Sequence, residues 1–253
     1  MRVLTLARDL KRRKSREKHS LFVAEGVRSV EELAESKLEI VGVLVAPQLA
    51  DAPRGARLRE MLEQRHVDVT AVNETEFRSA AETESPQGVL AIAKIPEFSL
   101  EGIAPNDPSR ILVLDAVQDP GNVGTILRTA AALSIKATVA LPGTVDVWNA
   151  KVVRASMGAS FRSPVLQCSA DELFAFLDTN GVELWGAEMD GESIDSVTAP
   201  GKLALAVGNE GAGLSSNVRA KSTRLVSLPI SGAVESLNVS VATGILLYQL
   251  RKE

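Results

Sequence analysis

Short apolar runs that alternate with helix-length segments are the feature that most constrains the fold of the second half of this chain. The runs lie at residues 111–114, 137–141, 182–187 and 203–207. Runs of four to six residues are typical of strands that are buried on both faces. Strands that alternate with helices form parallel sheets covered by those helices. We therefore predict an α/β fold with a mainly parallel sheet, and with helices at residues 122–133, 149–159, 171–180 and from 236 to about 250.

The first 95 residues predict a smaller α/β unit. Strands are expected at 21–26, 40–45, 67–72 and 89–93, and helices at 27–36 and 57–65. The segment 96–109 follows, which is rich in proline and has no apolar period, so it is predicted to be a linker. The predicted domains are therefore residues 1–95 and residues 110–253, with the linker 96–109 between them.

Composition excludes several classes of protein. The chain has 253 residues, of which 45% are hydrophobic, and this is ample for a packed core. A single cysteine, Cys168, excludes an intramolecular disulfide, and with only two histidines a Cys/His metal site is not expected. The N-terminus has no apolar signal region and no apolar run approaches membrane-spanning length, so the sequence predicts a cytoplasmic protein with no membrane partner.

Positive charge is concentrated near the N-terminus of a chain whose formal net charge is −4. That net charge argues against a protein that coats nucleic acid indiscriminately. A cluster of seven basic side chains nevertheless lies within eleven positions: Arg8, Lys11, Arg12, Arg13, Lys14, Arg16 and Lys18. Such a cluster is either a solvated helix face or a patch that guides a phosphate backbone. The sequence alone leaves both interpretations open.

Two strands near the C-terminus each lead into a loop that carries glycine and polar side chains. The run 203–207 is followed by Gly208 and Glu210, and the run 225–230 is followed by Ser236 and Asn238 at the start of the last helix. Loops at the carboxyl ends of parallel strands bind ligands in open α/β sheets, so the active site is predicted here. The glycine spacing is not the dinucleotide fingerprint and no Walker A lysine is present, which argues against a nucleotide-binding oxidoreductase.

A third polar loop, at residues 119–124, leads into the helix predicted at 122–133. A helix N-terminus beside glycines is a generic anion site, although Asn122 is also explained as an ordinary N-cap. Arg128 lies further along the same helix, among residues suited to burial. An arginine in that position is expected to reach towards an anion or a carboxylate.

The three loops together resemble the ordered motifs of the SpoU (TrmH-like) branch of the SPOUT RNA methyltransferases. The motifs are Asn122-x-Gly124-x-x-x-Arg128, then Gly208-Asn209-Glu210-x-x-Gly213, then Leu228-Pro229 followed by Ser236-Leu237-Asn238-Val239-Ser240. Their order and spacing are highly specific, and the resemblance covers residues 110–253. Residues 1–95, with Phe22-Val23-x-Glu25-Gly26, are similar to the ribosomal-protein-like substrate-binding domain that often precedes that catalytic domain.

The resemblance implies a fold and a cofactor. The C-terminal chain of this family forms a deep trefoil knot, an exception to the rule that connections do not thread. The loops of the knot hold S-adenosylmethionine in a bent shape, largely through backbone contacts. Carried over by position, the cofactor contacts fall on Gly208, Leu228, Ile230 and Leu237. Family members act as homodimers, with the site completed near the subunit interface.

The resemblance also implies a reaction, the transfer of a methyl group to a ribose 2′-hydroxyl of RNA. Ribosomal RNA is the expected substrate, and transfer RNA is the alternative. Arg128 matches the catalytic arginine, and Asn122, Glu210, Ser236 and Asn238 would orient it and the ribose. A guanidinium, whose pKa is above ~12, is a poor proton acceptor, so we favour a clamp that stabilises developing alkoxide charge. A further alternative is a catalytically silent RNA-binding protein of the same fold. The presence of Arg128, Glu210, Ser236 and Asn238 together argues against that alternative.

Overall fold

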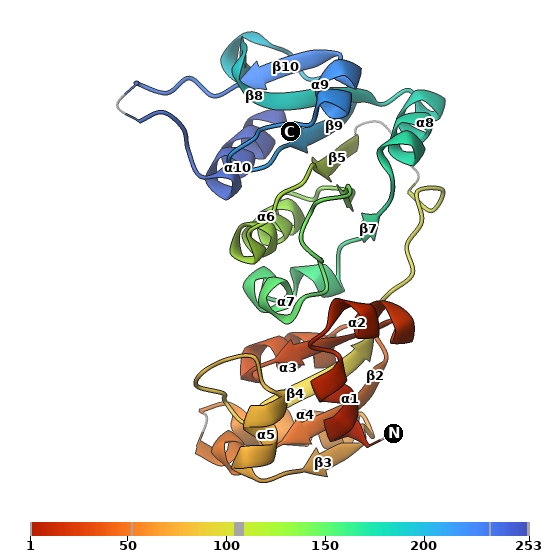
Figure 1. Ribbon diagram of the computed structural model, residues 1–253, viewed down its shortest axis with the longest axis vertical. Coiled ribbons are helices and arrows are strands. Elements are labelled where there is room, and N and C mark those ends of the chain that lie inside the picture. The colour runs from red at the N-terminus through yellow and green to blue at the C-terminus, as the bar shows by residue number, and fades with distance from the viewer. Residues whose placement is uncertain (1, 52, 104–108, 233, 252–253) are drawn as a thin grey trace. The chain divides into compact units, whose positions relative to one another are not determined.

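The computed structural model describes residues 2–51, 53–103, 109–232 and 234–251 (Figure 1). The chain divides into two compact units. The first comprises Met1–Glu97 together with Trp148–Arg162, and the second comprises Phe98–Val147 together with Ser163–Glu253. The sequence placed the segment 149–159 in the C-terminal domain, whereas the structure packs it with the N-terminal residues. Five residues of the predicted linker, 104–108, lie outside the described residues.

The first unit is built on a four-stranded mixed sheet of order β1-β4-β2-β3. β4 runs antiparallel to β1 and β2, and β3 runs parallel to β2. The strand bounds are β1 Leu21–Glu25, β2 Ile40–Val45, β3 Val69–Ala71 and β4 Val89–Lys94. The helices are α1 Val3–Asp9, α2 Arg13–His19, α3 Val27–Glu35, α4 Gly55–Gln64, α5 Glu74–Ala80 and α7 Ala150–Ser156, with a 3₁₀ turn at Pro47–Asp51.

Aromatic packing explains why the segment Trp148–Arg162 belongs to the first unit. The ring of Phe22 in β1 is fully buried, and its centroid lies 4.7 Å from that of Trp148 and 5.6 Å from that of Phe161. Arg162 adds an ion pair to Glu32 of α3 at 2.6 Å. Aromatic side chains bury large apolar areas. This packing groups the segment with the first unit, although in the sequence it lies between two strands of the second unit, β6 (Ala137–Ala140) and β7 (Val165–Gln167).

The second unit is built on a six-stranded sheet of order β10-β8-β9-β5-β6-β7, in which every neighbouring pair is parallel. The predicted parallel sheet is therefore confirmed. The strands are β5 Ser109–Leu114, β6 Ala137–Ala140, β7 Val165–Gln167, β8 Glu183–Ser193, β9 Lys202–Val207 and β10 Arg224–Ser227, and the helices are α6 Pro120–Ala132, α8 Ala170–Asn180, α9 Ser216–Lys221 and α10 Val239–Leu250. Short 3₁₀ turns lie at Ala159–Phe161 in the first unit and Ile194–Ser196 in the second.

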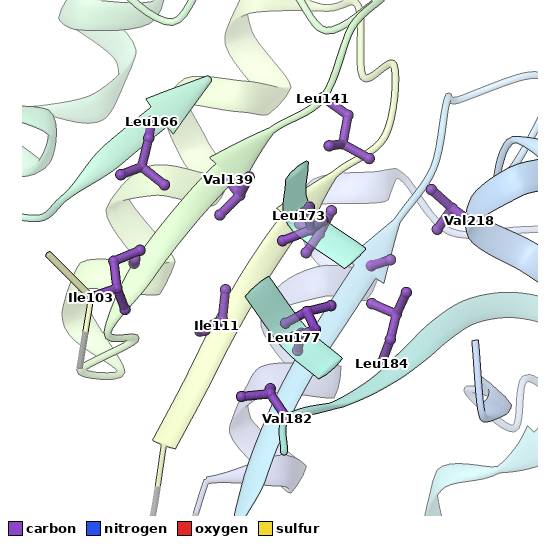
Figure 2. Close-up of a cluster of buried hydrophobic side chains, with 14 of the residues drawn as sticks. Ile103, Ile111, Val139, Leu141, Leu166, Leu173, Leu177, Val182, Leu184 and Val218 are labelled. Carbon is purple, nitrogen blue, oxygen red and sulfur yellow. The ribbon is translucent and has the colours of Figure 1, made fainter. Parts of the chain in front are cut away.

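Helices cover both faces of this sheet. Leu173 and Leu177 of α8 pack into a buried cluster with Ile111 of β5 and side chains from β6, β8 and β9 (Figure 2). Because successive residues of a strand point to opposite faces, Leu112 and Leu114 face the other side, where α6 and α10 pack against each other (Figure 1). No described helix is both long and apolar enough to span a membrane.

The strand order places a topological switch point between β5 and β9. The chain leaves β5 towards β6 and β7, whereas β8 and β10 lie on the other side of β9. At such a point the loops after the two central strands diverge and leave a crevice, which is where open α/β sheets bind ligands. A ligand site is therefore expected at the loops that follow Leu114 and Val207.

Two strand ends differ from the sequence prediction. β10 ends at Ser227, so Leu228, Pro229 and Ile230 lie in a loop. Pro229 has no N–H to donate to a sheet. β8 continues to Ser193, beyond the predicted end at 187, and its pairing with β10 shifts register between Leu225 and Val226.

Candidate active site

Three loops are joined by hydrogen bonds at the carboxyl ends of β5 and β9. Asn122 Nδ2 donates to Glu210 Oε1 at 3.0 Å, and Asn238 Nδ2 donates to Asn122 Oδ1 at 3.0 Å. The backbone N–H groups of Gln118 and Asp119 each donate to the Glu210 carboxylate at 3.2 Å. Residues from the three predicted motifs, separated by up to 116 positions, therefore form one network.

The N-cap of α6 is Asp119, which leaves the side chain of Asn122 free for this network. Asp119 Oδ1 accepts from the Asn122 N–H at 2.8 Å, and Pro120 occupies the first helical position. This arrangement is a favourable helix start, because proline needs no hydrogen-bond acceptor there. The interpretation of Asn122 as the N-cap is therefore wrong.

Glu210 is held as a carboxylate. Burial raises its pKa, but the hydrogen bonds from Asn122 and from the backbone of Gln118 and Asp119 outweigh that effect, so the pKa lies below the ordinary value for glutamate. A carboxyl group with a lowered pKa remains charged at neutral pH, and it takes up a proton only when the pH falls below the ordinary pKa range of glutamate. Glu210 is therefore suited to orient Asn122 and to attract positive charge, and not to accept a proton at neutral pH.

Asn209, next to Glu210, fixes the shape of the loop after β9. Its Nδ2 donates to Ala116 O at 3.0 Å, and its Oδ1 accepts from the N–H groups of Gly211 and Ala212 at 3.0 and 2.9 Å. Ala116 has φ 59°, a left-handed conformation that a non-glycine residue adopts at a cost. The sequence analysis did not single out Asn209 as a site residue, because its role is visible only when the two loops are placed together.

Gly208 lies where the same loop turns back on itself. A Cβ at this position would lie 2.2 Å from Gly213 C, 2.3 Å from Gly213 O and 2.5 Å from Leu214 N. All three atoms belong to the backbone, so no rotamer change relieves the overlap. Only glycine fits here.

A cavity of about 400 Å³ opens beside these loops, within the size range of small-molecule sites. Seven of the residues predicted to form the site line it: Gly208, Glu210, Leu228, Ile230, Ser236, Leu237 and Asn238. They include all four of the predicted cofactor contacts. The structure thus brings together, on one cavity, residues that the sequence presents in three separate segments.

Glu188 is a cavity residue that the sequence analysis missed. It belongs to the part of β8 beyond the predicted strand end, and its side chain is mostly buried. Its Oε1 accepts from the Leu214 N–H at 3.1 Å, and its Oε2 lies 3.5 Å from Arg219. Glu188 therefore supports the loop that begins at Gly208 and places a second carboxylate beside the cavity.

Arg128 lies apart from the Glu210 network. It is six residues beyond Asn122 on α6, and at about 100° per residue the two side chains leave the helix on different sides. Arg128 is exposed in a shallow hollow of about 670 Å³, which Thr125, Thr129, Ser240, Ile245 and Tyr248 also line. Among the described residues of this chain, no hydrogen-bond or ion-pair partner of its guanidinium is present, so the expected contact with a carboxylate is not made within the chain.

Most of the N-terminal basic cluster supports the fold of the first unit. Arg16 is buried and donates to Leu10 O and Lys11 O at 2.7 and 2.9 Å. Four others have partners: Arg8 with Ser79 at 2.7 Å, Lys11 with Ala81 O at 2.7 Å, Arg12 with Asp9 at 2.7 Å and Arg13 with Glu17 at 2.7 Å. Lys14 and Lys18 are exposed, with no such contact to the described part of the chain.

Comparison with known proteins places the chain in a family. A model described as the SpoU rRNA Methylase family matches residues 109–248, and one described as an MRM3-like substrate binding domain matches residues 4–91. The Bacillus subtilis 23S rRNA (guanosine(2553)-2′-O)-methyltransferase RlmP is 34% identical over 240 residues, which cover 94% of this chain and 92% of that protein.

Solved structures agree in both units. The SpoU methyltransferase AviRb from Streptomyces viridochromogenes, in complex with AdoMet, superposes with a TM-score of 0.89 at 25% identity, covering 98% of this chain and 96% of that one. The AdoMet-bound rRNA methyltransferase from Sinorhizobium meliloti gives a TM-score of 0.86 at 27% identity, covering 98% and 94%. Since the first family model spans more than half of the chain and the sequence likeness to RlmP extends over nearly all of it, the chain belongs to the SpoU family of rRNA methylases, as its three loop motifs predict.

Proposed function

We propose that this protein transfers a methyl group from S-adenosylmethionine to a ribose 2′-hydroxyl of ribosomal RNA. The observation that carries the proposal is the hydrogen-bonded network of Asn122, Glu210 and Asn238 at the edge of a cavity of small-molecule size. The names of RlmP and other relatives, which are 23S rRNA 2′-O-methyltransferases, support the choice of reaction and RNA. A ribosomal substrate also supports the expected location in the cytoplasm.

The cavity fits S-adenosylmethionine. Leu228, Ile230 and Leu237 offer apolar surface for an adenine, and the loop at Gly208 offers close backbone approach. Glu188 and Glu210 are carboxylates at the cavity, which favour a cationic ligand. When bound, the cofactor supplies an electrophilic methyl group on a sulfonium. The protein then has to position the ribose and activate its hydroxyl.

The side chains of the network are suited to that task. Glu210 fixes the orientation of Asn122, which in turn fixes Asn238, so a rigid set of amide groups stands at the start of α10. Ser236 lies on the same cavity with its hydroxyl available to a ligand. We assign Arg128 the role of clamping a substrate phosphate and stabilising alkoxide charge as the hydroxyl loses its proton.

The position of Arg128 supports a homodimer in which the partner's Arg128 completes each site. Val241, Ile245 and Tyr248 of α10 form a stripe beside Arg128, with relative exposures of 50%, 41% and 54%. Contiguous exposed apolar residues on a helix indicate an interaction surface. A second copy of the chain packed on this stripe would cover it and would bring the partner's Arg128 towards the network of Asn122, Glu210 and Asn238.

Ile245→Glu is expected to convert the dimer to a monomer, because a buried unpaired carboxylate in the interface is strongly unfavourable. Molar mass from light scattering would show the change, and methyl transfer should fall with it. Val41→Glu is the matched control, since Val41 is an exposed apolar residue of the first unit, at 39%. A wild-type protein that is monomeric at micromolar concentration, yet active, would contradict the proposal.

Methyl transfer itself is tested with labelled S-adenosylmethionine and unmodified transcripts. A Bacillus subtilis 23S ribosomal RNA transcript is expected to accept one methyl group at a ribose, and mass spectrometry of nuclease fragments would locate it. Guanosine 2553 is the first position to inspect, because RlmP is named for it. Methylation of transfer RNA with none on 23S RNA would favour the alternative substrate, and RNA binding with no transfer would favour the silent protein.

Two further features follow from the family resemblance as proposals. We infer that the C-terminal chain passes through a loop to form the trefoil knot, and the packing of α10 on α6 supports such a path. We also infer that the first unit, within residues 1–95, binds RNA, with Lys14 and Lys18 as the cations of the basic cluster that have no partner among the described residues. The match of residues 4–91 to a substrate-binding family supports this role.

A further inference from the structure

A small cavity in the first unit has the features of an anion site. It measures about 230 Å³ and lies at the N-terminus of α3, beside the Glu25-Gly26 pair. The lining residues come from three parts of the unit: Glu25, Gly26, Arg28 and Ser29, then Thr83, Ser85 and Gln87, and finally Arg154 and Met157 of the segment after Trp148. The function proposed above uses none of them.

The start of α3 favours negative charge in this cavity. The helix is nine residues long and its N-cap, Gly26, makes no side-chain cap. The Val27 N–H donates to Gln87 Oε1 at 2.9 Å. The unpaired amides of a first helical turn carry partial positive charge. Gly26 has φ 94°, which favours glycine and leaves the helix start without a covering side chain.

Two buried polar groups at the cavity have no partner within the described residues. Ser29 is only 6% exposed, and its Oγ makes no hydrogen bond there. Arg154 Nη1 is likewise buried and unpaired. A buried polar atom without a partner costs about 1–3 kcal/mol. Two residues that line the cavity, Ser29 and Arg154, therefore each carry a buried polar atom for which the described part of the chain supplies no hydrogen-bond partner.

The charge balance at the cavity is positive. Arg28 and Arg154 contribute two cations. Glu25 is the carboxylate in the lining, but it is buried and already accepts hydrogen bonds from Glu82 N at 2.7 Å, Thr83 N at 3.3 Å and the hydroxyl of Thr83. Its lone pairs are thus directed to the loop after α5, so the cavity presents donors to a ligand.

We propose that this cavity binds a phosphodiester group of the RNA substrate, held by Arg28, Arg154, the Ser29 hydroxyl and the backbone N–H groups of Arg28 and Ser29 in the first turn of α3. The proposal rests on the proposed function, because it names an RNA contact of the same enzyme. A phosphate matches the donor set, since arginine and helix N-termini are its usual partners. The match of residues 4–91 to a substrate-binding family favours RNA as the source of that phosphate.

Arg154→Gln and Ser29→Ala test the site, with Arg59→Gln as the control on α4, where Arg59 is exposed and outside the cavity. The probe is the 23S ribosomal RNA transcript, whose affinity is measured over a salt series. Arg154→Gln should weaken binding roughly 3- to 10-fold and flatten the salt slope by about 0.7–0.9, the value for one lost phosphate contact. Arg59→Gln should change the affinity much less.

Ser29→Ala separates a ligand role from a structural one. Removing a buried hydroxyl that has no partner should leave the melting temperature unchanged or slightly higher, while RNA affinity falls. S-adenosylmethionine affinity, measured by calorimetry, should remain that of the wild type in all three variants. Wild-type RNA affinity in both cavity variants would overturn the proposal, whether or not the protein methylates RNA.

Two further outcomes separate the phosphate site from the proposed methyl transfer. If the wild type binds RNA without methylating it and the cavity variants weaken that binding, the phosphate site stands and the proposed reaction fails. Inorganic phosphate, titrated while the amide signals of Arg28 and Ser29 are followed by NMR, should bind weakly, at millimolar concentration, and compete with RNA. Tight phosphate binding without any effect of the variants on RNA affinity would assign the site to free phosphate and overturn the proposal.

Discussion

Replacing Gly208 with valine is expected to lower the affinity for S-adenosylmethionine by at least about 100-fold. The new Cβ would lie within 2.5 Å of three backbone atoms of Gly213 and Leu214. Overlap with backbone forces the loop to move, at a cost of about 1–3 kcal/mol or more, and this loop forms one wall of the cavity. Isothermal calorimetry would measure the loss, and circular dichroism would confirm that the fold remains.

Gly211→Ala is the matched control within the same loop. A Cβ at Gly211 meets its nearest atom, Asn209 Oδ1, at 3.7 Å, an ordinary contact. Affinity close to that of the wild type is therefore expected. If Gly208→Val also binds S-adenosylmethionine normally, the cavity at this loop is not the cofactor site. A side chain at Gly208 would collide with the backbone of its own loop.

Arg128→Ala is expected to reduce methyl transfer by on the order of 10²-fold or more, the usual effect of losing one contact made in the transition state. Binding of S-adenosylmethionine should be retained, because Arg128 does not line the 400 Å³ cavity. Single-turnover rates and calorimetry would measure the two properties separately. Loss of cofactor binding in this variant would contradict the assignment.

Arg128→Lys distinguishes a clamp from a base. Lysine keeps the charge and loses a proton more easily, but it lacks the planar pair of donors that grips a phosphate. If Arg128 is a clamp, lysine should be nearly as inactive as alanine across a pH series. Rescue by lysine that grows as the pH rises would show instead that Arg128 acts by giving up its proton.

Mixing two inactive variants tests whether Arg128 acts on the partner's site. When Arg128→Ala is re-associated with Glu210→Ala, each mixed dimer contains one site with Glu210 from one subunit and Arg128 from the other. Random association of equal amounts should then restore about a quarter of the wild-type activity. If both residues serve the same chain's site, mixing restores nothing.

The sheet of the second unit was predictable because its strands are continuous apolar runs. The runs 111–114 and 203–207 lie within β5 and β9, with the ends shifted by at most two residues. The short helices α1, α2 and α5 were not predicted. Each has seven residues, too few to show a helical period, and α5 depends on a capping box between Asn73 and Glu76.

The candidate site was predictable in outline, because loops after parallel strands converge on one edge of the sheet. The contacts that give the site its shape could not be predicted from the sequence. The bonds from Asn122 to Glu210 and from Asn209 to Ala116 cross about 90 residues of sequence. Glu188 was missed because β8 continues past its predicted end, and the packing of Trp148 on Phe22 was not predicted because an aromatic contact between distant segments has no signature in a single sequence.

The network at Glu210 also has a thermodynamic consequence. Glu210 borders the cofactor cavity, and its partner Asn122 lies on α6, the helix that carries Arg128. If the cofactor orders the network at Glu210, part of the conformational entropy of α6 is already lost before RNA binds near Arg128. RNA binding then costs less conformational entropy, and the same holds in the reverse order. By linkage, the factor by which bound RNA strengthens cofactor binding must equal the factor by which the cofactor strengthens RNA binding. The two substrates of this protein would thus bind as cooperative partners and not in independent steps.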